Sequence, residues 1–431
     1  MGYTRIPFRR GALPAFGTAL VLLGVAACSG SGSGSGSDSG PQTVTLWVAS
    51  PTEAFTTNLV NAYNKTHKNQ VKVTGIPDDG FLQKVGTAAG AHALPDIVVS
   101  DVVYMPNYTS KGVFLDLTNR IKALPFAGGI APAHIAAGTW NGKEYGIPHK
   151  LASSVLFYNK TLFKKAGLDP DKPPANFTEL LADAKAIRAL GPDTYGFDFG
   201  GNCGGCTAYT MFPYMWAGGV DVLAEQGKKA NFDNDTVKQV FALYKQLWDA
   251  GVMPSNAMTQ DGSTWANNFE SGNVGMMAQG SAIVGALQKQ DSFDWGVAHL
   301  MAPDGSGGST FVGGDSAAIS ASSEHADAAW DFLQWTLQEQ QQVDIVAKNG
   351  DLPVRTDLAG NQYTAKDPRT KFIMDGVATG KTPFALPFGQ AFNDPTGPWI
   401  AMVRGAVFGA KPDDAVKTGQ QTIQSALDSA Q

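Results

Sequence analysis

The chain has 431 residues, of which 43% are hydrophobic and 16% charged, and its formal net charge is -6. This length is enough for two or three domains, and the hydrophobic fraction excludes wholesale disorder. Since 32 basic residues face 38 acidic ones, there is no excess of positive charge, and we expect no nucleic-acid partner.

Residues 1–28 have the pattern of an export signal. Three arginines within residues 1–10 precede an uncharged apolar run over 11–27, and small side chains stand directly before Cys28. This ending resembles a bacterial lipobox, which implies cleavage before Cys28 and a lipid on its thiol. Ordinary secretory cleavage with an incidental cysteine, or a single N-terminal membrane span, are the alternative interpretations.

Residues 29–40 consist of serine and glycine apart from one aspartate. Such a run buries no apolar surface and behaves as a flexible coil. We expect it to tether the folded part, from residue 41 on, to a lipid anchor at Cys28. The protein would then be held on the outer face of the cell membrane.

The two remaining cysteines, Cys203 and Cys206, enclose two glycines. In an exported chain, two thiols at this spacing favour a local disulfide. Zinc needs about four ligands, and neither a second cysteine pair nor a nearby histidine is available. A redox site is the other alternative, but such motifs carry an aromatic residue or proline between the cysteines. We therefore expect a structural disulfide and neither a metal nor a cofactor.

The first part of the folded chain alternates strands with helices. Thr43–Val48 alternates polar and apolar residues, Phe55–His67 has apolar residues at helical spacing, and Val71–Val73 is a short strand. Phe81–Ala91 is helical, and Pro95–Asp101 is apolar and continuous, as in a buried parallel sheet. This order predicts a doubly wound α/β fold.

The pattern continues along the rest of the chain. Strands are predicted over 154–158, 273–279, 293–300 and 317–321. Helices are predicted around Leu162, over 177–190 and 237–248, from Ser322 or Ser323 toward Gly350, and over 399–407 and 412–427.

Several segments, in this order, carry a family resemblance: 43–48, 95–99 with 112–117, 142–148 with 157–160, 269–277, 313–319 and 352–354. Together they resemble the family-1 solute-binding proteins of ABC importers, the group that includes maltose- and other oligosaccharide-binding proteins. Each segment alone is a weak signal. Their order over most of the chain, behind a lipobox and a flexible tether, is specific.

The resemblance implies a two-lobed α/β structure, the type II periplasmic-binding-protein fold, in which two open sheets flanked by helices enclose a ligand cleft. The N-lobe would comprise 41–149 and a return segment 313–352, and the C-lobe 150–312 and 353–431. A sugar that contacts both lobes would favour the closed form, which would dock on the transmembrane permease subunits. The expected protein is a monomer that performs no covalent chemistry.

Four candidate ligand residues follow predicted strands of the first lobe. The resemblance places Thr52 and Glu53 in a polar loop after the first strand, where ligand hydroxyls find partners. The alternative is that these two residues cap the next helix and place an acid in its first turn. Asp101 and Tyr104 follow the third strand at its carboxyl end, where a capping role competes with ligand binding.

Four aromatic residues are candidate platforms for the apolar faces of a sugar: Tyr209, Trp216, Trp265 and Trp399. The resemblance places Tyr209 and Trp216 in an aromatic segment of the second lobe, where a core role is the alternative. Trp265 would face the cleft, and Trp399 would pack on the sugar.

Gly313, Gly314 and Asp315 match the return crossing of the family, where glycine permits close approach of backbone to ligand and hinge flexibility is the alternative. The chain departs from the family at 280–282. Some members carry a tryptophan there, whereas this chain has Gly-Ser-Ala, so its subsites differ from the maltose type.

Two other functions compete with that of an importer. An exported carbohydrate-active enzyme would need two carboxylates roughly 5–10 Å apart in a cleft. A surface binding protein or adhesin could use the same fold without transport. The chain carries no Gly-x-Ser-x-Gly, His-Glu-x-x-His or Ser-x-x-Lys motif in a supporting context, and its histidines lack metal-ligand spacing.

Overall fold

One long strand, β6 (Gly146–Asn159), belongs to two groups of strands at once. The computed structural model describes residues 40–430. The chain from Pro41 on forms one unit by its internal contacts. The predicted signal at 1–28, the lipidation of Cys28 and nearly all of the tether at 29–40 lie outside the described residues.

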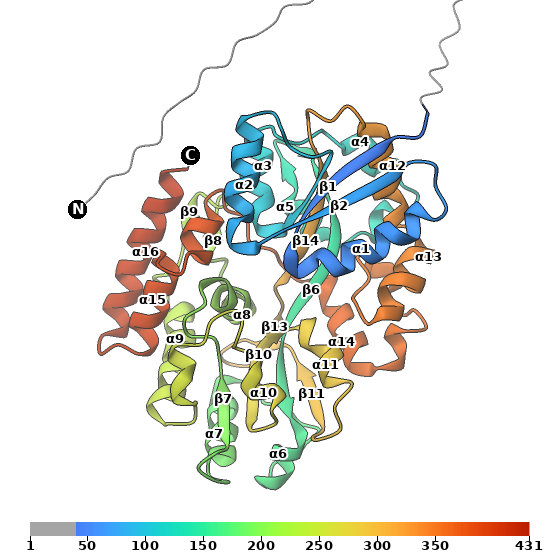
Figure 1. The fold of residues 1–431 in the computed structure, drawn as a ribbon. Coiled ribbons are helices and arrows are strands. Elements are labelled where there is room, and N and C mark those ends of the chain that lie inside the picture. The colour runs from blue at the N-terminus through green and yellow to red at the C-terminus, as the bar shows by residue number, and fades with distance from the viewer. Residues whose placement is uncertain (1–39, 431) are drawn as a thin grey trace, which may run out of the picture. The chain divides into compact units, whose positions relative to one another are not determined.

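The first group of strands, which we call the first half-sheet, pairs with the beginning of β6 (Figure 1). In spatial order its strands are β2 (Gln70–Ile76), β1 (Thr43–Ala49), β3 (Ile97–Asp101), β14 (Val312–Ile319) and β6. β1 pairs in parallel with β2 and β3, whereas β14 is antiparallel to both β3 and β6. Val44, Leu46 and Val48 of β1 are fully buried, as the predicted alternation requires.

The second half-sheet pairs with the remainder of β6. Its strands are β7 (Tyr195–Asp198), β10 (Val274–Gly280), β6 and β11 (Trp295–Ala298). β10 is parallel to β7 but antiparallel to β6, and β11 is also antiparallel to β6. Three two-stranded pairs complete the strands: β4 (Thr139–Trp140) with β5 (Lys143–Glu144), β8 (Leu223–Ala224) with β9 (Lys229–Ala230), and β12 (Leu300–Met301) with β13 (Gly308–Ser309).

Helices flank both half-sheets. Those up to the end of β6 are α1 (Ser50–Asn64), α2 (Asp78–Gly90), α3 (Met105–Ser110), α4 (Thr118–Lys122) and α5 (Pro132–Ala137). Those between β6 and β14 are α6 (Lys160–Lys165), α7 (Phe177–Arg188), α8 (Gly204–Ala217), α9 (Asp235–Asp249), α10 (Asn267–Glu270) and α11 (Val284–Leu287). Those after β14 are α12 (Ala326–Thr336), α13 (Glu339–Gln341), α14 (Pro368–Val377), α15 (Pro398–Val407) and α16 (Pro412–Asp428). Two further short helical turns are η1 (Val102–Tyr104) and η9 (Gly389–Asn393).

The α/β class predicted from the sequence is confirmed. Side chains cap two of the predicted helices: Asn176 accepts a hydrogen bond from Glu179 N at 2.9 Å, and Asn234 accepts one from Val237 N at 3.0 Å. Among the helices between residues 40 and 430, none is long and apolar enough to span a bilayer.

Two predicted boundaries were wrong, and one helix was not predicted. The segment from Ser50 to Thr52, expected as a loop, forms the first turn of α1 behind Ala49, because Pro51 has no N–H to satisfy there. No helix was predicted where α8 lies, because its Gly-Gly start and internal Pro213 disfavour a helix, yet burial of most of its residues outweighs that preference. β14 begins at Val312, five residues earlier than expected.

The two crossing strands β6 and β14 slip by one residue where they meet. The register shifts between Asp315 and Ser316, opposite Lys150 and Pro148, so that His149 is the extra residue of a bulge. Gly314, just before the shift, has φ +100°. A Cβ at Gly314 would overlap the carbonyl oxygen of Lys150, so both its conformation and its surroundings require glycine.

Replacing Gly314 with alanine should therefore lower the free energy of unfolding by roughly 2–4 kcal/mol, through a strained φ and a backbone clash. Gly285 of α11 is the matched control, because a Cβ there meets no atom within 4 Å. Gly285→Ala should raise the free energy of unfolding by roughly 0.5–1 kcal/mol. Urea unfolding of both variants measures this, and equal effects would contradict the assigned role of Gly314.

Candidate functional site

Three of the predicted residues meet beside the crossing strands. Thr52, in the first turn of α1, donates a hydrogen bond from Oγ1 to Asp315 Oδ2 at 2.7 Å, and both side chains are buried. Asp315 stands opposite Asp101 in the register of β14 and β3. Opposite residues of antiparallel strands have Cβ atoms about 4.5–5.5 Å apart, so the two carboxylates are close neighbours.

Tyr209 of α8 fills the space between a glycine of each half-sheet. A Cβ built on Gly280 would lie 2.9 Å from Tyr209 Cε1, and one built on Gly313 would lie 2.9 Å from Cε2. The ring also packs edge-on against Phe311, with centroids 4.9 Å apart. Gly280 stands where some family members carry a tryptophan. Because Gly280 has no side chain, the Tyr209 ring can lie directly against it.

The hydroxyl of Tyr209 is buried and has no hydrogen-bond partner among the described residues. Burial raises the pKa of this hydroxyl, and the charge of Asp101 raises the pKa further, so the group stays neutral. Leaving a buried hydroxyl without a partner costs roughly 1–3 kcal/mol. A ligand hydroxyl next to Tyr209 would remove that cost.

Tyr104 connects η1 to a segment near the C-terminus. Its Oη accepts a hydrogen bond from Asn393 Nδ2 of η9 at 2.6 Å. Tyr104 also lines a cavity of about 600 Å³ together with Asn107, Leu386 and Gln390. The contact joins residues nearly 300 positions apart, and Tyr104 follows Asp101, the last residue of β3, by three positions.

Trp265 and Glu53 each lie against a glycine. Trp265 is half-buried, and a Cβ on Gly200 would lie 3.0 Å from Trp265 Cβ. Glu53, an exposed acid in the first turn of α1, has its carboxylate over Gly75 of β2.

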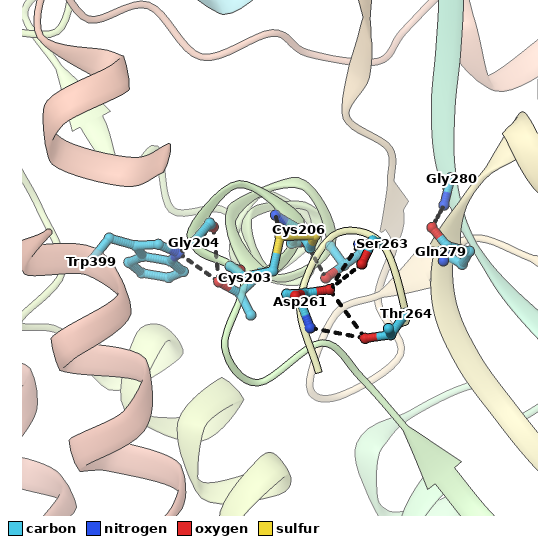
Figure 2. Close-up of a disulfide and its surroundings, with 11 residues drawn as sticks. Cys203, Gly204, Cys206, Asp261, Ser263, Thr264, Gln279, Gly280 and Trp399 are labelled. Carbon is cyan, nitrogen blue, oxygen red and sulfur yellow. Dashed lines mark hydrogen bonds between the residues drawn. A yellow bond between two sulfur atoms is a disulfide. The ribbon is translucent and has the colours of Figure 1, made fainter. Parts of the chain in front are cut away.

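Trp216 and Trp399 are more buried than Trp265. Trp216 is 6% exposed, packs near Phe311 with centroids 5.7 Å apart, and lines a cavity of about 410 Å³. Trp399 is fully buried, and its Nε1 donates to Gly204 O at 3.1 Å and to Thr207 Oγ1 at 2.9 Å (Figure 2). The packing of Trp399 is thus complete without a ligand.

Two buried histidines support the crossing strands, and the sequence analysis gave neither a role. His134 of α5 has Nε2 3.0 Å from Gly313 O and Nδ1 3.2 Å from Ser316 Oγ. Since a carbonyl only accepts, Nε2 carries the proton and Nδ1 accepts from the serine. His149 Nε2 lies 2.9 Å from Thr56 Oγ1, which donates to Thr52 O at 3.0 Å.

Burial keeps both imidazoles neutral. It lowers the pKa of His134 to about 4, and it lowers the pKa of His149 to about 3 with a smaller contribution from the charge of Lys150. Protonation of His134 would place a charge next to β14, the strand that carries Gly313 and Asp315.

Asp198, at the carboxyl end of β7, is a further buried acid that the sequence analysis did not single out. It accepts hydrogen bonds from Gln260 Nε2 at 3.0 Å and Asn268 Nδ2 at 2.8 Å, yet burial raises its pKa to about 6. An aspartate that ends a short strand, as Asp101 does, was the available signal. In the part of the chain from 40 to 430, no group of three or more His, Cys, Asp or Glu could hold a metal ion.

The chain is similar to known proteins both in sequence and in structure. A family model described as bacterial extracellular solute-binding protein matches residues 58–371. A relative from Brucella abortus, named as a binding protein, is 28% identical over 290 residues, which are 67% of this chain and 69% of that protein. The diacetylchitobiose-binding protein DasA of Streptomyces coelicolor is 23% identical over 426 residues, or 95% of this chain and 96% of that protein. The crystal structure of the cyclic α-maltosyl-1,6-maltose-binding protein of Arthrobacter globiformis is similar with a TM-score of 0.77 at 27% identity, covering 90% of this chain and 100% of that chain.

The buried histidines should make the free energy of unfolding depend on pH. Since the pKa of His134 is about 4 in the folded chain and 6.5 when unperturbed, the unfolded chain binds more protons between these values. The free energy of unfolding should therefore fall as the pH is lowered from 6.5 to 4, by roughly 3 kcal/mol for this residue. Urea unfolding at several pH values tests this. His134→Gln should flatten the slope, whereas replacing exposed His92 with asparagine should leave it unchanged, and an unchanged slope in His134→Gln would contradict the assignment.

Proposed function

Because the chain belongs to the bacterial extracellular solute-binding proteins, we propose that it captures a sugar beside the crossing strands and presents it to the transmembrane subunits of an ABC importer. The observation that carries the proposal is the buried hydroxyl of Tyr209, without a partner among the described residues, next to Gly280 and Gly313. Asp101 and Asp315 supply carboxylates on the adjoining strands.

The chemistry of these groups favours a neutral, hydroxyl-rich ligand. Carboxylates accept hydrogen bonds from hydroxyls, and an aromatic ring packs against the C–H face of a sugar. The nearby cation Lys150 is already paired with Asp351, with the charged atoms 3.6 Å apart. Asp101 and Asp315 would therefore repel a phosphorylated ligand.

The proposal includes two lobes, 41–149 with 313–352 and 150–312 with 353–431. A sugar that contacts both lobes favours their closed arrangement by the difference of its affinity for the two states. The closed arrangement is then the one that docks on the permease.

The proposal further includes a lipid anchor on Cys28, the tether at 29–40 and a monomer on the outer face of the membrane. It also includes binding without catalysis, which the names of the relatives support, since each is a binding protein. Turnover of a glycoside by the purified protein would argue for an enzyme instead.

A panel of ligands tests the proposed class. The chain from Asp38 on is heated with mono- and oligosaccharides, and with sugar phosphates, amino acids, polyamines and metal ions as controls. A ligand at about 100 times its Kd adds about 2.7 kcal/mol of stability, which raises Tm by several degrees. We expect neutral sugars to raise Tm and sugar phosphates to leave it unchanged. A response only among the controls would overturn the sugar assignment.

Tyr209→Phe separates binding from stability. Loss of the hydroxyl should weaken sugar binding about tenfold, because one hydrogen bond to the ligand is lost. The Tm of the free protein should stay the same or rise, since the buried hydroxyl has no partner to lose. Tyr244→Phe is the matched control, because Tyr244 Oη is also buried with no hydrogen-bond partner between residues 40 and 430, but its ring packs against Phe197 and Phe199. If both variants bind sugar like the wild type, Tyr209 is not part of the site.

A further inference from the structure

The disulfide between Cys203 and Cys206 closes the start of the helix that carries Tyr209. Cys203 is the residue before α8, and its Sγ accepts a hydrogen bond from Cys206 N at 3.1 Å. Tyr209 follows Cys206 by three residues and so lies on the same face of the helix. The position of the first turn of α8 therefore affects where the backbone of Tyr209 lies relative to Gly280 and Gly313.

A second segment of the site packs directly on the two sulfur atoms. A Cβ built on Gly262 would lie 3.7 Å from the Sγ of both Cys203 and Cys206, which is ordinary van der Waals contact. Gly262 belongs to a tight turn in which Asp261 Oδ1 accepts from Ser263 N at 3.0 Å and from Ser263 Oγ at 2.7 Å (Figure 2). The turn leads directly into Trp265, whose N–H donates to Asp261 O at 3.1 Å.

A third contact connects the same helix turn to the first half-sheet. A Cβ on Gly205 would lie 2.9 Å from Asn393 Oδ1, and Asn393 donates from Nδ2 to Tyr104 Oη. The turn closed by the disulfide thus adjoins the residues that lead to Tyr209, Trp265 and Tyr104.

The sequence of this turn explains why a cross-link is useful. Gly204 and Gly205 are the two residues between the cysteines, and glycine is the residue least able to hold a helical turn apart from proline. A Cβ on Gly204 would overlap the backbone oxygen of Phe392, and one on Gly205 would lie 2.9 Å from Asn393 Oδ1 and displace that side chain. The close packing requires glycines, and the disulfide offsets their conformational freedom.

We infer that the Cys203–Cys206 disulfide is a positioning element of the ligand site, which holds Tyr209 and the turn before Trp265 in their binding arrangement. The inference rests on the proposed function. The cross-link closes a loop of only four residues, so it restricts the unfolded chain far less than a long loop would. Its effect should therefore appear in ligand affinity and local order more than in global stability.

The test uses the full chain, purified in detergent, and a sugar that raises its Tm. Calorimetric titration compares the oxidised protein, the protein reduced with a phosphine, the reoxidised protein and Cys203→Ala/Cys206→Ala. We expect Kd to rise about tenfold on reduction and in the double variant, because two side chains must then be ordered by the ligand. Reoxidation should restore the affinity, and the reductant should not change the double variant further.

Hydrogen exchange gives a readout that a merely stabilising disulfide would not produce. Reduction should speed exchange in 203–209 and 261–265, with Tm nearly unchanged. Asn176→Ala is the control, because it removes the cap of α7, another helix start of the second half-sheet, without touching the site. This variant should lower Tm and leave Kd unchanged.

The outcomes separate the two proposals. An oxidised protein that binds none of the sugars would overturn the proposed function and the inference together. Sugar binding with the same Kd in the oxidised and reduced protein, or exchange in 261–265 that does not respond to reduction, would overturn the positioning role alone and leave the proposed function standing.

Discussion

The sharing of β6 between the two half-sheets is the constraint on which the rest of the site depends. β14 and β10 flank β6 on its two edges, with Gly313 opposite Ala152 and Gly280 opposite Ser154. Ala152 and Ser154 are two residues apart on β6 and so share one face. A single ring lying across that face, that of Tyr209, therefore reaches both glycines. The register of one strand thus places residues of both half-sheets around one hydroxyl.

The fold was predictable where local pattern and tertiary packing agree. The alternation in β1 and the apolar spacing in α9 were enough to find these elements. α8 was missed because its glycines and Pro213 oppose a helix, and only the burial of its residues against the rest of the chain stabilises it. The strand predicted at the position of β14 was too short, because Gly313 and Gly314 have no side chains and therefore show no alternation of polar and apolar residues.

The residue types of the candidate site came from the sequence, whereas its geometry did not. An aspartate at the end of a strand pointed to Asp101, and the family resemblance pointed to Tyr209 and Asp315. The hydrogen bond between Thr52 and Asp315 joins residues 263 positions apart, and no local pattern encodes it. Trp399 lies in a segment for which the resemblance implied contact with a sugar. In the structure its side chain is fully buried, and its Nε1 already donates a hydrogen bond to Thr207 Oγ1.

The most direct test is a crystal structure of the protein with the sugar that stabilises it most. The account predicts electron density for the sugar with a hydroxyl within hydrogen-bond distance of Tyr209 Oη, and with further hydroxyls on Asp101 or Asp315. Density instead in the cavity lined by Leu386 and Gln390, or in the one lined by Trp216, with Tyr209 Oη still unpartnered, would contradict it.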